Sequence, residues 1–508
     1  MFKKIQNYLL INYPLLWNIK IVPMASFLIV FNIIFFFLGY VSGEIDFTTT
    51  GGNYYKNNQE IILFFGVLIS ILLFIVWLVF YLKNNGFKSF YPKRNNSLFK
   101  EWFIIFSLLI LISSFSFSFL FGSDLRVKSY YSEKEATKRC ATLAKASLFL
   151  GYTYDGPQYV DKMINDTLQS VPLDHVLFNN KKYSLESLIN KDIENFSFFE
   201  VTSDSLTKIK IKNWLVNQQK DSIKAVMNDF FKIANEHNLR SNVDAEKWFS
   251  IVYNYPTFTQ TLKVAKEEKG YYNNYGNEYA NSETTTIDGA YEYNYDSINQ
   301  YTKTIGKEKY IFNRNYVPAE VLFSNYEEIA STYTSSSIKE EMILFALYFS
   351  FGLAIVIFSF RISSGRNWLI ALVSLGVLNI LLGILSGIFG SEKFYLSGLL
   401  VVSMSLFIYF IFITSRKTTK GISPITLNGL LWLFPTVIPI VYYLLFNFLK
   451  YTYGYYERYD DFNYDNYPVL KFLKDNDESM LWLNVVFVIV MMYFFSIKIK
   501  KWKGIAEN

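Results

Sequence analysis

The chain has 508 residues, of which 51% are hydrophobic and 19% aromatic, and its formal net charge is +6. It is richer in Phe and Tyr than ordinary globular proteins are, which favours a membrane protein. Lys and Arg flank alternate ends of apolar stretches and form no basic face, so nucleic acid is excluded as an expected partner.

The first twenty residues are mildly amphipathic, with Leu9, Leu10 and Trp17 among Lys and Asn. Such a pattern predicts a helix in the plane of the membrane interface, with membrane lipid as its partner. The apolar run that follows lacks the short core and small-x-small cleavage site of a signal peptide. We therefore expect it to be an uncleaved anchor.

Eight apolar stretches, each without a charged residue or His in its interior, run through the chain. Each has about the 20 residues that a helix needs to cross roughly 30 Å of hydrocarbon. A backbone in lipid must satisfy its own hydrogen bonds, so the expected fold class is an all-α polytopic membrane protein with eight transmembrane helices. Ion-coupled transporters and proton pumps bury ionisable groups at membrane depth, which argues against those classes. The predicted spans are 21–42, 61–82, 102–122, 342–360, 368–390, 395–414, 426–449 and 481–497.

Basic residues cluster before the first span and after the second, fourth, sixth and eighth spans, as at Lys93, Arg366 and Lys417. The positive-inside rule then places both termini in the cytoplasm. We expect a multi-pass protein of the cell membrane, of the bacterial inner-membrane type.

The predicted organisation is an interfacial helix with spans one to three in 1–122, an extracytoplasmic domain in 123–340, and spans four to eight in 341–508. Helical periodicity predicts a mainly helical domain, in which Ser132 and Glu135 fit a capping box. Alternating polarity favours short strands at 196–202 and 207–214. The predicted helices of this domain are 132–150, 157–171, 219–238, 243–253 and 319–333.

The segment 270–300 is rich in Tyr and Asn and has too few aliphatic residues to form a core. It is interpreted either as a mobile loop or as a flap that contacts a ligand, since Tyr and Asn offer stacking surface and hydrogen bonds. Cys140, the single cysteine, is expected to be a small core residue. His175 and His237 lie far apart in sequence and show no metal-ligand spacing, so no metal site is expected.

The loop between the second and third spans combines five basic residues with a cluster of aromatic residues. Topology explains the basic residues but not the aromatic ones, which indicate docking onto a partner or folding back on the headgroups. The hypothetical docking residues are Phe87, Phe90, Tyr91, Lys93 and Arg94.

An interfacial helix, two spans and a compact basic-aromatic loop before a third span resemble the front half of ABC-type exporter permeases. The resemblance covers about residues 1–122 and implies that this loop couples to a groove on a separate cytoplasmic ATPase subunit. The chain departs from that family in its eight spans, where six are usual, and in the large domain after the third span. It contains no G-x-x-x-x-G-K-[ST] phosphate loop, so ATP hydrolysis would belong to the partner.

Two spans carry residues that affect helix packing and shape. Gly383 and Gly387, four residues apart, let two helix backbones approach closely, either within this bundle or at the seam of a homodimer. Pro435 and Pro439 predict a kinked helix, an arrangement suited to lining a translocation path or forming a gate.

The expected function is a membrane-embedded, permease-like subunit of an ABC-type export or envelope-remodelling complex, which is not an enzyme and holds no cofactor. One alternative is a non-transporting sensor or scaffold with an extracytoplasmic binding domain. A second is a polytopic envelope glycosyltransferase, because Glu44 and Asp46 resemble the metal-binding E-x-D pair of that class. The loop 44–60 that carries them is shorter than is usual for those enzymes.

Overall fold

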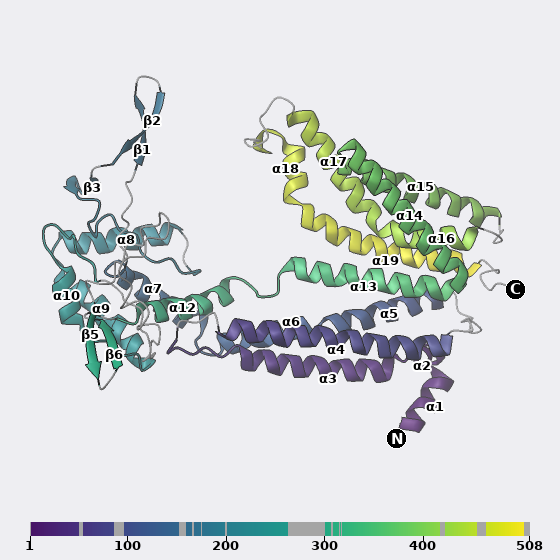
Figure 1. The fold of residues 1–508 in the computed structure, drawn as a ribbon, viewed down its shortest axis with the longest axis horizontal. Helices are drawn as coiled ribbons and strands as arrows, with labels where there is room; N and C mark the ends of the chain where they lie inside the picture. The colour runs from purple at the N-terminus through teal and green to yellow at the C-terminus, as the bar shows by residue number, and fades with distance from the viewer. Residues whose placement is uncertain are drawn as a thin grey trace. The chain divides into compact units, whose positions relative to one another are not determined.

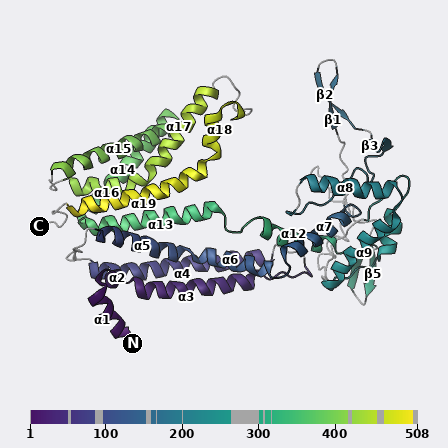
Figure 2. The ribbon, with the colours of Figure 1, turned by 180° about the vertical axis from the view of Figure 1, so that it is seen from behind.

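The structure is a computed structural model, and it divides into two units (Figure 1; Figure 2 from behind). Unit 1 comprises Met1–Phe37, Ile62–Leu120 and Ile338–Asn508, and unit 2 comprises Leu38–Ile61 and Phe121–Ser337. The described residues are 2–49, 54–85, 96–151, 159–164, 167–173, 175–198, 201–262, 300–305, 308–313, 315, 317–416, 422–454 and 464–501. The Tyr- and Asn-rich segment 270–300 lies outside them, apart from Gln300.

Seven described helices are long and apolar enough to cross a membrane, or eight if one bent pair counts as a span. All lie at the predicted positions, so the chain is a mostly helical, polytopic membrane protein. They are α3 (Ile21–Ser42), α4 (Tyr54–Asn85), the bent pair α5 (Ser97–Ser113) and α6 (Phe115–Lys128), α13 (Glu340–Ile362), α14 (Gly365–Phe389), α15 (Glu392–Arg416), α16 (Ser423–Leu433) continued by α17 (Val437–Gly454), and α19 (Asp477–Lys501). Shorter helices are α1 (Phe2–Asn12), α2 (Pro14–Ile19), η2 (Phe434–Thr436), η3 (Tyr464–Asn466) and α18 (Pro468–Asp475).

The predicted span 102–122 is two helices that meet at a bend of 43°. The Ser114 hydroxyl bonds back to the carbonyl of Leu111 (3.0 Å), a contact that bends helices. Asn32 on α3 reaches this bend, where its amide donates to the Leu111 carbonyl (3.2 Å) and its Oδ1 accepts from Ser114 (2.9 Å) and Ser118 (2.8 Å). Side chains thus satisfy the polar groups of the bend, as a membrane interior requires.

Close packing of α3, α4 and α6 centres on a glycine. A Cβ built on Gly66 would lie 2.3 Å from a ring carbon of Phe115 and 2.7 Å from one of Phe35. Both rings are buried in the same apolar cluster. The missing side chain at Gly66 is therefore what allows these three helices to approach.

The larger core of unit 1 joins α5 to α13, while α14, α15 and α16 pack on one another. The rings of Phe106 on α5 and Phe351 on α13 stack with centroids 4.2 Å apart, and both are buried. This stack fixes the face of α13 that meets α5, and it leaves another face of α13 directed away from α5.

Unit 2 is mainly helical, with three two-stranded antiparallel sheets in its described part. Four of its predicted helices are confirmed, and the Ser132 hydroxyl caps the first by accepting the N–H of Glu135 (3.4 Å). The helices are α7 (Glu133–Ser147), α8 (Val201–Val216), α9 (Lys220–Glu236), α10 (Ala245–Val252) and α12 (Ala319–Thr334). The strands are β1 (Tyr159–Ile164), β2 (Thr167–Pro172), β3 (Val176–Phe178), β4 (Lys181–Tyr183), β5 (Gln300–Ile305) and β6 (Glu308–Asn313).

Two predictions in this domain are wrong. The predicted helix 157–171 is the hairpin of β1 and β2, in which Ile164 pairs with Thr167, and β-branched residues at its paired positions suit strands. The predicted strands at 196–202 and 207–214 give way from Val201 onward to α8. Ile211 and Leu215, one helical turn apart, are both buried there, so helical spacing outweighs the alternation of the sequence.

Candidate functional site

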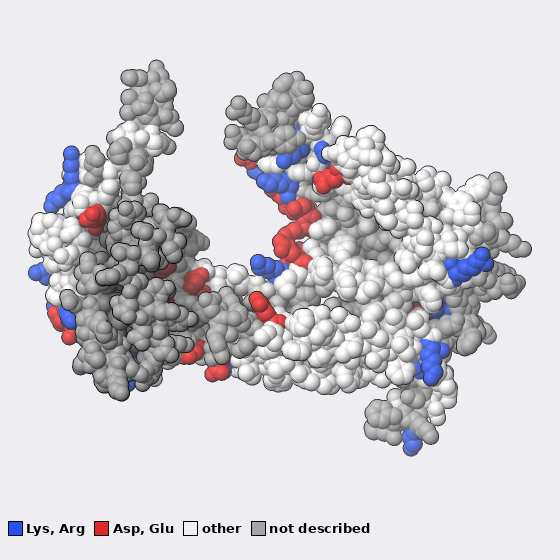
Figure 3. All heavy atoms as spheres, in the orientation of Figure 1, with Lys and Arg blue, Asp and Glu red and all other residues white. Residues whose placement is uncertain are grey.

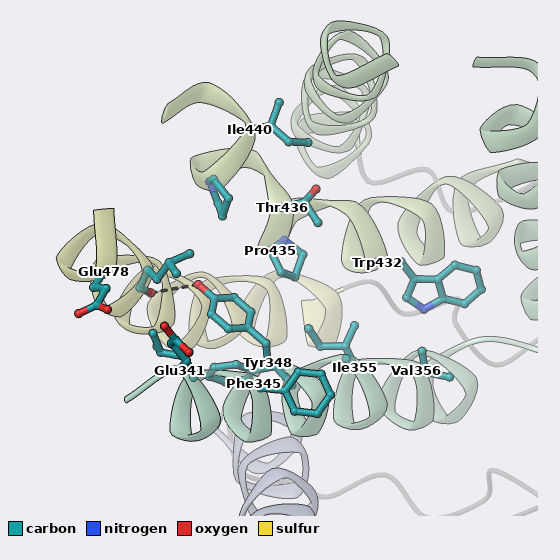
Figure 4. Close-up of a pocket in the computed structure, with 15 residues that line it drawn as sticks. Glu341, Phe345, Tyr348, Ile355, Val356, Trp432, Pro435, Thr436, Ile440 and Glu478 are labelled. Carbon is teal, nitrogen blue, oxygen red and sulfur yellow. Dashed lines mark hydrogen bonds between the residues drawn. The ribbon is translucent and has the colours of Figure 1, made fainter. Parts of the chain in front are cut away.

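A cavity of about 680 Å³ lies within unit 1, between α13, the junction of α16 and α17, and α19 (Figure 4). Its volume is typical of small-molecule sites. The lining is mostly apolar and aromatic: Glu341, Leu344, Phe345, Tyr348, Phe351, Gly352, Ile355, Val356, Trp432, Pro435, Thr436, Pro439, Ile440, Glu478 and Leu481.

One face of α13 forms the first wall. Its lining residues recur every three or four positions from Glu341 to Val356, which is the spacing of a single helix face. At 1.5 Å per residue, this face extends about 22 Å, or roughly three quarters of a 30 Å hydrocarbon layer. A Cβ built on Gly352, on the same face, would meet no atom within 4 Å, so the glycine leaves the space beside α13 open.

The opposite wall is the helix interrupted at Pro435. Because proline has no N–H and its ring clashes with the preceding turn, α16 ends at Leu433 and a 3₁₀ turn precedes α17. The structure places both Pro435 and Pro439 in the cavity wall. The carbonyl of Pro435 accepts a hydrogen bond from Nδ2 of Asn484 on α19 (2.9 Å), which satisfies a backbone acceptor at the break.

A polar network that includes the lining residues Tyr348 and Leu481 ties the three walls together. Asn484 is fully buried, and its amide also donates to the hydroxyl of Tyr348 on α13 (2.9 Å). That hydroxyl in turn donates to the carbonyl of Leu481 (3.0 Å). These bonds hold α13, η2 and α19 around the cavity, and sequence reasoning singled out neither Asn484 nor Tyr348.

Two carboxylates mark one end of the cavity. Glu341 in the first turn of α13 and Glu478 in the first turn of α19 lie at the end opposite Val356 and Trp432 (Figure 4). Glu340 accepts a hydrogen bond from the indole of Trp482. Acidic side chains gather at the end of unit 1 where α13 and α19 begin, with basic side chains beside them (Figure 3). The described residues that line the cavity include no Lys, Arg or His.

The other sequence-derived candidates have different surroundings. The docking residues Phe87, Phe90, Tyr91, Lys93 and Arg94 lie outside the described residues. At both Gly383 and Gly387, an added Cβ would meet no described atom within 4 Å, so the described part of the chain packs nothing tightly against them.

The acidic pair that resembles a glycosyltransferase motif has partners within unit 2. Glu44 pairs with Arg126 (3.7 Å). One carboxylate oxygen of Asp46 accepts from the N–H (2.9 Å) and the hydroxyl (2.6 Å) of Thr48. The Asp46 contacts are those of a local turn.

A buried ion pair joins α5 to α13. Glu101 and Arg361 are 1% and 6% exposed, and Nε of Arg361 lies 3.4 Å from the Glu101 carboxylate. The hydroxyl of Tyr81 on α4 donates to the same carboxylate oxygen (2.9 Å). Both residues lie one position outside the predicted spans, whose interiors carry no charged residue, so the sequence patterns did not point to this pair.

In unit 2, His237 is the centre of an aromatic cluster. Its ring stacks on Phe47 (centroids 4.0 Å apart), and its Nε2 lies 2.9 Å from the hydroxyl of Tyr326. Arg139 also donates to that hydroxyl (3.2 Å) and pairs with Glu236 (2.5 Å). Burial, and secondarily the charge of Arg139, lowers the pKa of His237 to about 4.

Unit 2 is therefore expected to lose stability as the pH falls from about 6.5 to about 4. Over this range the unfolded chain protonates His237 while the folded chain does not, so the full stabilisation is present only above the unfolded pKa. The loss is on the order of 2 kcal/mol. It can be measured as the unfolding midpoint of the full-length protein against pH. The variant His237→Gln should show a shallower dependence, and an unchanged slope would contradict this assignment.

A second cavity, of about 590 Å³, lies within unit 2 beside the start of α12. Nζ of Lys191 donates to the carbonyl of Ser147 (3.2 Å), and burial lowers the pKa of Lys191 to about 8. The acidic residues that line this cavity are Asp192, Glu194, Glu320 and Glu327. A lysine among carboxylates suits a small ligand that carries both charges.

Comparison of the chain with protein-family models, with curated proteins and with solved structures finds no match.

Proposed function

We propose that this protein is a permease-like membrane subunit that binds an apolar, membrane-derived molecule in the cavity between α13, α17 and α19. The observation that carries the proposal is the cavity itself, which is lined by apolar side chains and lies within a bundle of candidate spans. A site of this lining gains binding free energy from hydrocarbon and little from a polar solute.

The interrupted helix supports this reading. Broken helices that line a cavity are a common means of building a binding site in membrane transporters. Here Pro435 and Pro439 stand in the wall, and Asn484 satisfies the backbone carbonyl at the break. The interrupted helix thus lines the cavity with its backbone acceptor at Pro435 satisfied.

The energy for transport comes from ATP hydrolysis by a separate subunit. The basic-aromatic loop that contains Phe90 and Tyr91 docks on a separate ATPase, and the complex exports its ligand or remodels the envelope. Its support is the resemblance of residues 1–122 to ABC-type exporter permeases and the lack of a phosphate loop in this sequence.

A glycine pair allows a matched test of the cavity. Neither Gly352 in the cavity wall nor Gly376 on α14 has an atom within 4 Å of an added Cβ. Gly352→Phe is expected to fill the cavity and to lower the amount of co-purifying lipid-like molecule about tenfold, the equivalent of 1.4 kcal/mol of binding. Gly376→Phe should retain it. The measurement is mass spectrometry of small molecules extracted from protein purified out of native membranes.

Equal retention by both variants would show that the cavity binds nothing from the membrane. In the same purification, mass spectrometry of the proteins tests whether a nucleotide-binding subunit co-purifies with the unmodified chain. A retained ligand without such a subunit would contradict the ABC-type assignment and leave cavity binding intact.

That outcome would favour a sensor or scaffold. The cavity at Lys191 supports this second function, because it gives unit 2 a mixed polar site of its own. In that case, Lys191→Met would abolish the response of the protein to a small ligand bound in this second cavity. The amount of lipid-like molecule that co-purifies with the protein would stay unchanged.

A further inference from the structure

We propose that the molecule bound in the cavity between α13, α17 and α19 is an amphiphile with a cationic head group. This inference rests on the proposed function and adds the chemical class of the ligand. Its head lies between Glu341 and Glu478, and its hydrocarbon follows the face of α13 toward Val356 and Trp432 (Figure 4).

The polarity of the cavity changes along its length. At one end, Glu341 and Glu478 line the cavity from the first turns of α13 and α19. At the other end, the lining residues Ile355, Val356 and Trp432 are apolar or aromatic. A molecule that matches both ends has one charged and one apolar part.

The sign of the head group follows from the charges at that end. Glu340 and Asp477 add two further carboxylates beside the two that line the cavity. Lys339 precedes the first turn of α13 and Lys474 lies shortly before α19, but neither lines the cavity. An anionic head would be repelled here, whereas a cation lowers the mutual repulsion of the acidic groups.

The helix dipole explains why acidic residues occur in the first turns of helices in general. It does not explain why two of them line the same cavity. Glu392 in the first turn of α15 interacts equally well with its own helix, yet it accepts a hydrogen bond from Tyr443 and does not line this cavity. Glu341 and Glu478 differ from it because two helices direct them to the same end of one cavity. Glu392 therefore provides the matched control.

The test uses the full-length protein in nanodiscs of zwitterionic lipid. The probes are brominated alkyl chains of one length that carry a trimethylammonium, a sulfate or a glucoside head. Bromine quenches nearby tryptophan, and the contribution of Trp432 is the difference between the unmodified protein and Trp432→Phe. We expect the trimethylammonium probe to bind about tenfold more tightly than the sulfate probe. The preference should fall to about twofold in Glu341→Gln with Glu478→Gln and should persist in Glu392→Gln.

The outcomes separate this inference from the proposed function. If all three probes quench Trp432 equally, and Gly352→Phe abolishes quenching, the head-group inference fails and cavity binding stands. If no probe quenches Trp432, both fail. A preference lost equally in Glu392→Gln would reflect general surface charge and would also overturn the cationic site.

Discussion

Replacing Arg361 by Met is expected to destabilise the protein by about 3–5 kcal/mol, the usual cost of leaving a buried charge without its partner. Glu101 is 1% exposed, and its carboxylate contacts Arg361 on α13 and the Tyr81 hydroxyl on α4. Without the guanidinium, this carboxylate must stay buried with one neutral donor or take up a proton. The loss can be measured as the apparent melting temperature of the full-length protein in detergent, followed by tryptophan fluorescence.

The double variant Glu101→Gln with Arg361→Met is the control. It removes both charges, so most of the lost stability should return, because a buried ion pair replaced as a whole is often neutral. The Gln side chain still accepts the hydrogen bond of Tyr81. If the double variant melted as low as Arg361→Met alone, the loss would come from packing of the long arginine side chain and not from charge.

Gly66→Ala is expected to cost about 1–3 kcal/mol, in the range of an overpacked core. Its Cβ would lie 2.3 Å from the ring of Phe115 and 2.7 Å from that of Phe35, so α3, α4 and α6 must separate or both rings must move. The effect appears as a lower melting temperature and a smaller monodisperse fraction in size-exclusion chromatography.

Gly376→Ala makes the same change in α14, where the added Cβ meets no atom within 4 Å. It should stabilise the helix slightly, by about 0.5–1 kcal/mol, because alanine loses less backbone entropy than glycine. A loss of similar size at Gly376 and Gly66 would indicate a general intolerance of α-carbon substitution and would contradict the packing explanation.

The positions of the spans could be predicted from sequence because hydropathy over some twenty residues is a strong and local signal. The bend at Ser114 could not, since it depends on Asn32, which is far away in the chain. Similarly, whether one segment becomes the hairpin of β1 and β2 and another becomes the helix α8 depends on which of their residues pack into a core. Short segments with mixed patterns carry too little information for that choice.

The cavity was partly predictable. Pro435 and Pro439 indicated an interrupted helix, and both prolines line the cavity. The regular spacing from Glu341 to Val356 was also present in the sequence, but every face of a membrane helix is apolar, so it does not show which face borders a cavity. Asn484 became informative only when the structure placed its amide on the Pro435 carbonyl.

The Glu101–Arg361 pair also constrains how the protein is made. Some 260 residues of chain separate the two partners (361 − 101). At 5–20 residues per second, the ribosome needs about 13–52 s to synthesise that stretch. During this time α5 has a carboxylate whose counterion does not yet exist, so Glu101 either stays hydrated or carries a proton. The Glu101–Arg361 pair is therefore a late contact in biogenesis, formed only after the end of α13 has left the ribosome.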